Sequence, residues 1–173
     1  MMKQLLLLIF PVFVVLSFGC KSVSQFPMDE PSAEYLNDKL IGKWKTVEDS
    51  DKNNFFEIAK SMAANKYKVK YWNRGGTNPT YEANVFFSKI NNTLFLNIPY
   101  WHEDREKSYY QTVGYFFVKI VNVNSDYSKL TTATVSDTSL GRLGSQLEVY
   151  NRIAKNLNNR SYYSDTVHFY KIN

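Results

Sequence analysis

The residues best able to do chemistry gather in one short stretch, residues 101–106, with the sequence WHEDRE. A histidine beside carboxylates could bind a metal ion or act as a general base. Successive residues of a strand point to opposite faces, so His102 and Glu103 converge only if this stretch is a loop. Pro99 precedes the stretch and charged residues fill it, which predicts a solvated loop. We expect the other histidine, His168, at a core or rim position. The sequence predicts no catalytic residue, metal site or cofactor, and therefore no enzyme.

Cys20 is the single cysteine in 173 residues, and it follows an apolar run. One cysteine can form no internal disulfide, and no second thiol exists to complete a zinc site. A positive start at Lys3, the apolar residues 5–18 and the small Gly19 before the cysteine are typical of an export signal. The run is also too short, with Pro11 inside it, for a transmembrane helix of about 20 residues.

Residues 17–20, SFGC, resemble the lipobox of bacterial lipoproteins, although Ser17 stands where the pattern of that family prefers leucine. The resemblance implies a signal peptide over residues 1–19, cleavage before Cys20 and a diacylglycerol on its thiol. Each buried methylene of such a chain contributes about 0.8 kcal/mol to membrane binding. By resemblance to enterobacterial lipoproteins, Lys21 favours the outer membrane. The expected location is the bacterial cell envelope; a plain secretory signal with an incidental cysteine is the alternative.

The composition of the chain is that of a folded protein rich in β structure. Apolar residues make up 44% and charged residues 21%, and 13 Tyr and 12 Phe favour half-buried pleated surfaces. The net charge is +5 with Lys and Arg spread along the chain, so nucleic-acid binding is not expected. Residues 20–39 hold two prolines and no sustained period, which predicts, after the cysteine, a flexible tether spanning roughly 25 Å. The folded domain is expected over residues 40–173.

Alternation of apolar and polar residues predicts a series of strands in this domain. Residues 66–71, KYKVKY, alternate strictly, with Tyr67, Val69 and Tyr71 on one face. Gly114 lies inside a long β run, where it marks a bulge or a sharp bend. The expected strands are 41–47, 55–59, 66–71, 81–90, 93–98, 108–124, 130–135 and 167–172. About eight strands joined mostly by short turns predict a mainly β protein with an up-and-down antiparallel barrel.

One segment before the last strand breaks this pattern. Apolar residues recur there at spacings of three and four: Leu143, Leu147, Tyr150, Ala154 and Leu157. This period predicts an amphipathic helix of about twelve residues, packed on or across the barrel. Ser145 and Glu148 stand three apart at its start, where they predict a capping box.

Gly42-Lys43-Trp44, at the start of the first predicted strand, is similar to the G-x-W motif of lipocalins and related calycin barrels. Residues 124–127, NSDY, are similar to the T-D-Y loop of the same proteins. The resemblance implies a lipocalin-like barrel over residues 40–173, with Trp44 closing its bottom. Lys171 is the nearest match to the arginine that packs over that tryptophan. Lipocalins carry their helix after the eighth strand, whereas this chain places it before the last one.

The interior of the predicted barrel is the candidate binding site, because eight strands enclose either packed side chains or one small ligand. The residues expected to line a ligand are Tyr67, Tyr71, Tyr81, Phe87, Leu96 and Phe116. One hypothesis is a membrane-anchored lipoprotein whose barrel holds a small apolar molecule. The other is a filled barrel whose outer surface meets an envelope protein through exposed aromatic residues, near 100–101 or 162–163. A cavity inside the barrel favours the first hypothesis, and a packed interior favours the second.

Overall fold

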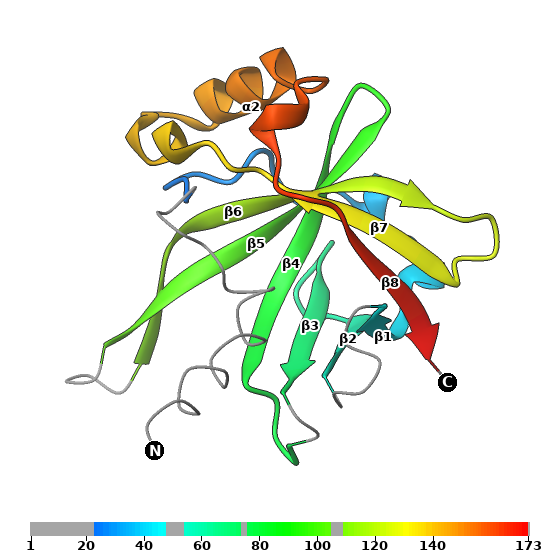
Figure 1. The fold of residues 1–173 in the computed structure, drawn as a ribbon. Coiled ribbons are helices and arrows are strands. Elements are labelled where there is room, and N and C mark those ends of the chain that lie inside the picture. The colour runs from blue at the N-terminus through cyan, green and yellow to red at the C-terminus, as the bar shows by residue number, and fades with distance from the viewer. Residues whose placement is uncertain (1–22, 48–53, 74–75, 105–108, 173) are drawn as a thin grey trace, which may run out of the picture.

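The computed structural model describes residues 23–47, 54–73, 76–104 and 109–172, with the side chains of all of these except 101–104 and 109–112. Within these ranges, eight antiparallel strands follow one another in chain order around a closed barrel, and the last pairs with the first (Figure 1). The strands are β1 (Gly42–Thr46), β2 (Phe55–Lys60), β3 (Tyr67–Trp72), β4 (Tyr81–Ile90), β5 (Thr93–Asp104), β6 (Tyr109–Val123), β7 (Lys129–Thr134) and β8 (Val167–Ile172). The predicted fold class is confirmed.

The strands β5 and β6 form a long hairpin that reaches beyond the rest of the barrel (Figure 1). Its register shifts where Tyr100 pairs with Gly114 and Trp101 pairs with Thr112, so Val113 is the extra residue of a bulge. The bulge predicted at Gly114 is therefore confirmed. The loop predicted over residues 101–106 was wrong for 101–104, because these residues continue β5 and pair with the start of β6.

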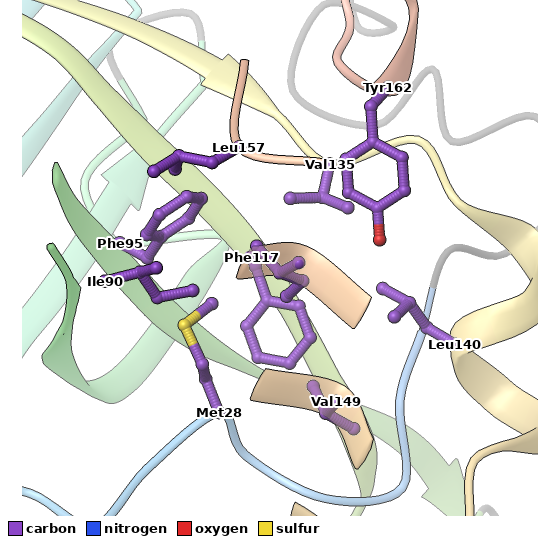
Figure 2. Packing of buried hydrophobic residues seen from close by; sticks show 10 residues of the cluster. Met28, Ile90, Phe95, Phe117, Val135, Leu140, Val149, Leu157 and Tyr162 are labelled. Carbon is purple, nitrogen blue, oxygen red and sulfur yellow. The ribbon is translucent and has the colours of Figure 1, made fainter. Parts of the chain in front are cut away.

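Buried side chains form two clusters, one on each face of the barrel wall. Side chains alternate between faces along a strand, so neighbouring residues of β5 and β6 contribute to different clusters. The inner cluster fills part of the barrel and contains Leu40, Trp44, Ile58, Tyr67, Ala83, Val85, Phe87 and Leu130. The outer cluster lies on the outside of β5 and β6 and includes Met28, Ile90, Phe95, Phe117, Val135 and Leu140 (Figure 2).

The helix α2 (Gln146–Lys155) covers the outer cluster, and it comes before the last strand as predicted (Figure 1). Its buried residues are Val149 and Ile153. The periodicity placed Leu147 on the apolar face, but that side chain is 67% exposed. This part of the prediction was wrong because only the tertiary contacts decide which side of a short helix meets the barrel.

The start of α2 is capped as the sequence predicts. The Ser145 hydroxyl accepts a hydrogen bond of 3.3 Å from the backbone N–H of Glu148. The Glu148 carboxylate accepts one of 2.9 Å from the N–H of Gly144, one residue before the cap. Two N–H groups at the helix start thus find acceptors. The connection around α2 also contains the 3₁₀ helices η3 (Thr138–Arg142) and η4 (Arg160–Tyr162).

Residues 23–40, which we call the N-terminal belt, run along the outside of the barrel to its closed end (blue to cyan in Figure 1). Ser24 exchanges backbone hydrogen bonds of 2.8 and 2.6 Å with Tyr115 of β6. Met28 is 1% exposed and belongs to the outer cluster, and its N–H donates to Asn97 Oδ1 at 2.9 Å.

The belt differs from the flexible tether that we expected over residues 20–39. Its isolated apolar residues show no period along the chain, yet the barrel wall offers them a buried surface. The belt ends in the 3₁₀ helices η1 (Ala33–Tyr35) and η2 (Asp38–Leu40). Within the described ranges, no helix has both the length and the apolar character needed to cross a bilayer.

Candidate functional site

One end of the barrel is closed around Trp44, which is 0% exposed. Its indole Nε1–H donates to the carbonyl of Leu40 at 3.0 Å, so η2 is fixed against the tryptophan. The Lys171 ammonium lies 5.6 Å from the ring centroid and donates to the carbonyl of Lys39 at 3.0 Å. A cation over an indole face is attracted by the ring quadrupole. Lys171 thus occupies the place over Trp44 that the lipocalin resemblance suggests.

Gly42 makes this closure possible. Its φ angle is +139°, and a Cβ atom there would lie 2.5 Å from Cε of Lys171. Any larger residue would meet both an unfavourable backbone conformation and the lysine side chain that covers Trp44. Both Gly42 and Trp44 of the G-x-W motif are therefore needed for the packing of Lys171 over the indole ring.

The rest of the closed end is also packed. The rings of Tyr67 and Phe87 meet edge to face at 5.7 Å, and the two residues are 2% and 5% exposed. The Tyr67 hydroxyl accepts a hydrogen bond from the backbone N–H of Asn37, and the Asn37 side chain donates to the Tyr127 hydroxyl at 2.9 Å. Burial raises the pKa of Tyr67. These contacts bury both rings and fix the Tyr67 hydroxyl to the belt.

The inner face of β5 and β6 is different, because its apolar side chains remain half-buried rather than buried. The inner face of β4 provides the contrast, with Ala83, Val85 and Phe87 only 3%, 0% and 5% exposed. Phe116 and Val118 share the inner face through their pairing with Ile98 and Leu96. The half-buried inner residues are Leu94, Leu96, Ile98, Phe116, Val118 and Ile120. We call them the inner wall.

Leu96 and Val118 lie where β5 and β6 are paired on both sides, so their half-buried state indicates accessible space inside the barrel. Ile98 and Phe116 lie just beyond these ladders, where β5 and β6 pair only with each other. Tyr71 and Tyr81 pair across β3 and β4 and are also half-buried. The Tyr81 hydroxyl donates to the carbonyl of Pro99 at 2.9 Å, and burial raises its pKa, so it stays protonated at neutral pH. The space thus has an apolar wall with a neutral phenol beside it.

The six predicted ligand contacts separate into two groups by burial. Tyr71, Tyr81, Leu96 and Phe116 are half-buried, whereas Tyr67 and Phe87 are buried, although Phe87 pairs directly with Leu96. Sequence reasoning missed Ile98, although the alternation that begins at Leu94 and Leu96 continues to it. Its position next to Pro99 made it look like the end of a strand.

The other candidate residues form no chemical centre. His168, the second residue of β8, is exposed and not in the core, and its Nδ1 is 3.0 Å from the Thr131 hydroxyl. In the part of the chain that the structure describes, no three His, Cys, Asp or Glu residues are arranged to hold a metal ion. The side chains of 101–106 lie outside the described residues, as does Cys20.

Of the two aromatic surfaces considered for a protein partner, the one at 162–163 differs from the expectation. Tyr162 is 9% exposed and packs edge to face on the half-buried Tyr163, so no exposed patch exists there. Tyr100 is 40% exposed.

In comparisons with known proteins, the chain matches no family model, no curated protein and no solved structure.

Proposed function

We propose that this chain is a membrane-anchored lipoprotein of the bacterial cell envelope whose lipocalin-like barrel binds a small apolar ligand against the inner wall. The observation that carries the binding proposal is the half-buried state of the inner wall beside the buried inner face of β4. Apolar surface left in water inside a barrel represents free energy that a ligand can recover, at about 25 cal/mol per Å².

The chemistry of the inner wall defines the class of ligand. Its residues are aliphatic or aromatic, with no charged group among them. Pockets of this kind bind apolar molecules and use a few polar groups to orient them. Tyr71 and Tyr81 lie nearest to that role. An uncharged, largely hydrocarbon ligand therefore fits the space better than a sugar or a nucleotide.

Filling the interior tests the binding proposal. The neutral dye N-phenyl-1-naphthylamine should bind the protein with increased fluorescence. Val118→Trp should weaken this binding about tenfold or more, because the indole takes the ligand's space at a cost comparable to overpacking a core, about 1–3 kcal/mol. Val121 is the matched control, since it belongs to the same strand and is 46% exposed. Val121→Trp should leave the dye affinity unchanged.

Two results would count against a ligand-binding interior. One is no binding of the dye to the unaltered protein, and the other is equal affinity in both tryptophan variants. Either result would favour the alternative, a filled barrel that acts through its outer surface. Thermal melts of Val118→Trp and of the smaller change Leu96→Phe show whether each variant is folded. Weaker dye binding by a folded variant then reports on space that the new side chain occupies, and not on unfolding.

The anchor is tested separately at Cys20. Cys20→Ala should move the protein from the membrane fraction to the soluble fraction and abolish labelling by a palmitate analogue, because two or three acyl chains provide stable anchoring. Cell fractionation and gel fluorography measure both effects. A Cys20→Ala protein that stays in the membrane fraction would overturn the lipoprotein proposal and leave the binding proposal standing.

A further inference from the structure

A cleft of about 320 Å³ opens on the outer wall of the barrel, where β3 to β6 lie side by side. Its apolar floor is formed by the buried residues Phe86 and Pro99, and Ala83, whose side chain belongs to the inner cluster, also borders it. Its rim is polar and consists of Lys66, Lys68, Glu82, Asn84 and Tyr115. The volume is that of a site for a small molecule. Its lining includes Lys68, Glu82, Asn84 and Phe86 of the outer face of β3 and β4, and none of the inner-wall residues.

The charges of the rim favour an anion. The Glu82 carboxylate lies 2.6 Å from the Lys68 ammonium and 3.7 Å from that of Lys70, and the hydrogen bond from Lys68 lowers its pKa. This carboxylate is therefore already balanced by lysines of its own face. Lys66 has no carboxylate within ion-pair distance among the described residues. Its ammonium lies 5.7 Å from the centroid of the Phe86 ring. One cation at the rim thus remains for a ligand.

The other groups of the cleft fit a planar body that carries this anion. The rings of Phe86 and Tyr115 meet edge to face at 6.4 Å. Burial, and next the nearby charge of Glu30, raise the pKa of Tyr115, so its hydroxyl is a proton donor at neutral pH. The Asn84 oxygen accepts from the Ser61 hydroxyl at 2.8 Å, which leaves the amide N–H₂ as its donating end. Two neutral donors, the Tyr115 hydroxyl and the Asn84 amide, therefore line the same cleft as the Lys66 ammonium and the Phe86 ring.

We propose that this outer cleft binds a small organic anion, a carboxylate or sulfonate on a planar aromatic body, with Lys66 holding the acid group and Phe86 and Tyr115 contacting the ring. This site is additional to the proposed function and does not depend on it, since it uses neither the inner wall nor the lipid anchor.

The probe for the test is 2-naphthoate, with the neutral alcohol 2-naphthalenemethanol as its matched control, titrated into the purified full chain by calorimetry. The naphthoate should bind at least fivefold more tightly than the alcohol. Lys66→Gln should weaken naphthoate binding about ten- to hundredfold, the loss expected for a hydrogen bond to a charged group. Lys129 is exposed on β7, far around the barrel, so Lys129→Gln should change nothing.

Every other outcome overturns the proposal. Absence of naphthoate binding at millimolar concentration would show that the proposed site does not exist. Equal binding of the acid and the alcohol would show that the cleft has no preference for an anion. Equal weakening by Lys66→Gln and Lys129→Gln means that only net charge matters. Loss of naphthoate binding in Val118→Trp would place the anion inside the barrel instead of in the cleft. The dye measurement reports on the interior independently, so the two proposals can fail separately.

Discussion

At the scale of single residues, the closed end depends on contacts among three residues. Lys171 covers the Trp44 ring, Trp44 holds the carbonyl of Leu40, and Gly42 leaves the space through which Lys171 passes. The glycine contributes by lacking a Cβ atom at a positive φ angle. Stability of this end is therefore most sensitive to a methyl group at Gly42.

Gly42→Ala should lower the free energy of unfolding by about 1–3 kcal/mol, because a non-glycine residue at this φ is strained and its Cβ displaces Lys171. Urea denaturation followed by tryptophan fluorescence measures the change. Gly144 is the matched control, since the nearest atom to a Cβ there would be an oxygen of the flexible Glu148 carboxylate at 4.0 Å. If Gly144→Ala lowers the free energy of unfolding as much as Gly42→Ala does, neither the φ angle of Gly42 nor its contact with Lys171 accounts for the loss.

At the scale of elements, the N-terminal belt and α2 share one buried surface. Met28 of the belt and Val149 of α2 both join the cluster on the outside of β5 and β6 (Figure 2). Beneath Met28 the buried side chain of Asn97 donates to the Ser88 hydroxyl at 2.8 Å and accepts from the Met28 N–H. The belt therefore supplies both an apolar contact and a hydrogen bond that Asn97 would otherwise lack.

Met28→Ala should lower the free energy of unfolding by about 2–4 kcal/mol, because truncating a buried methionine leaves a cavity. Met62→Ala is the control, since Met62 is fully exposed and should cost almost nothing. Denaturant titration of both variants gives the comparison. A small loss at Met28, similar to that at Met62, would show that the belt contributes little to the stability of the fold.

At the scale of the whole molecule, the barrel could be predicted because its signals are local. Strict alternation in residues 66–71 marks β3, and two asparagines between apolar runs mark the turn from β4 to β5. Gly114 marks the bulge of β6, and Ser145 marks the cap of α2. Each of these signals occupies only a few neighbouring residues, so it can be read without knowledge of the partner strand.

The remaining features depend on contacts between distant segments, and no local pattern carries them. Val149 is buried and Leu147 is exposed because the outer wall meets one side of α2, although both residues are apolar. Phe87 and Leu96 are direct partners across β4 and β5, yet Phe87 is buried and Leu96 is half-buried, a difference that no alternation pattern carries. The outer cleft joins residues of separate strands, which alternation alone cannot bring together.

For the proposed lipid on Cys20, the pairing of Ser24 with Tyr115 has a consequence for the distance between the barrel and the membrane. Only two residues separate Cys20 from Val23, where the belt begins, and three extended peptide units span at most about 11 Å. A lipid on Cys20 would thus be held close to the β6 side of the barrel, by a connection of only a few residues. Such a protein would lie against the bilayer with a preferred orientation, and its rotation relative to the membrane would be restricted.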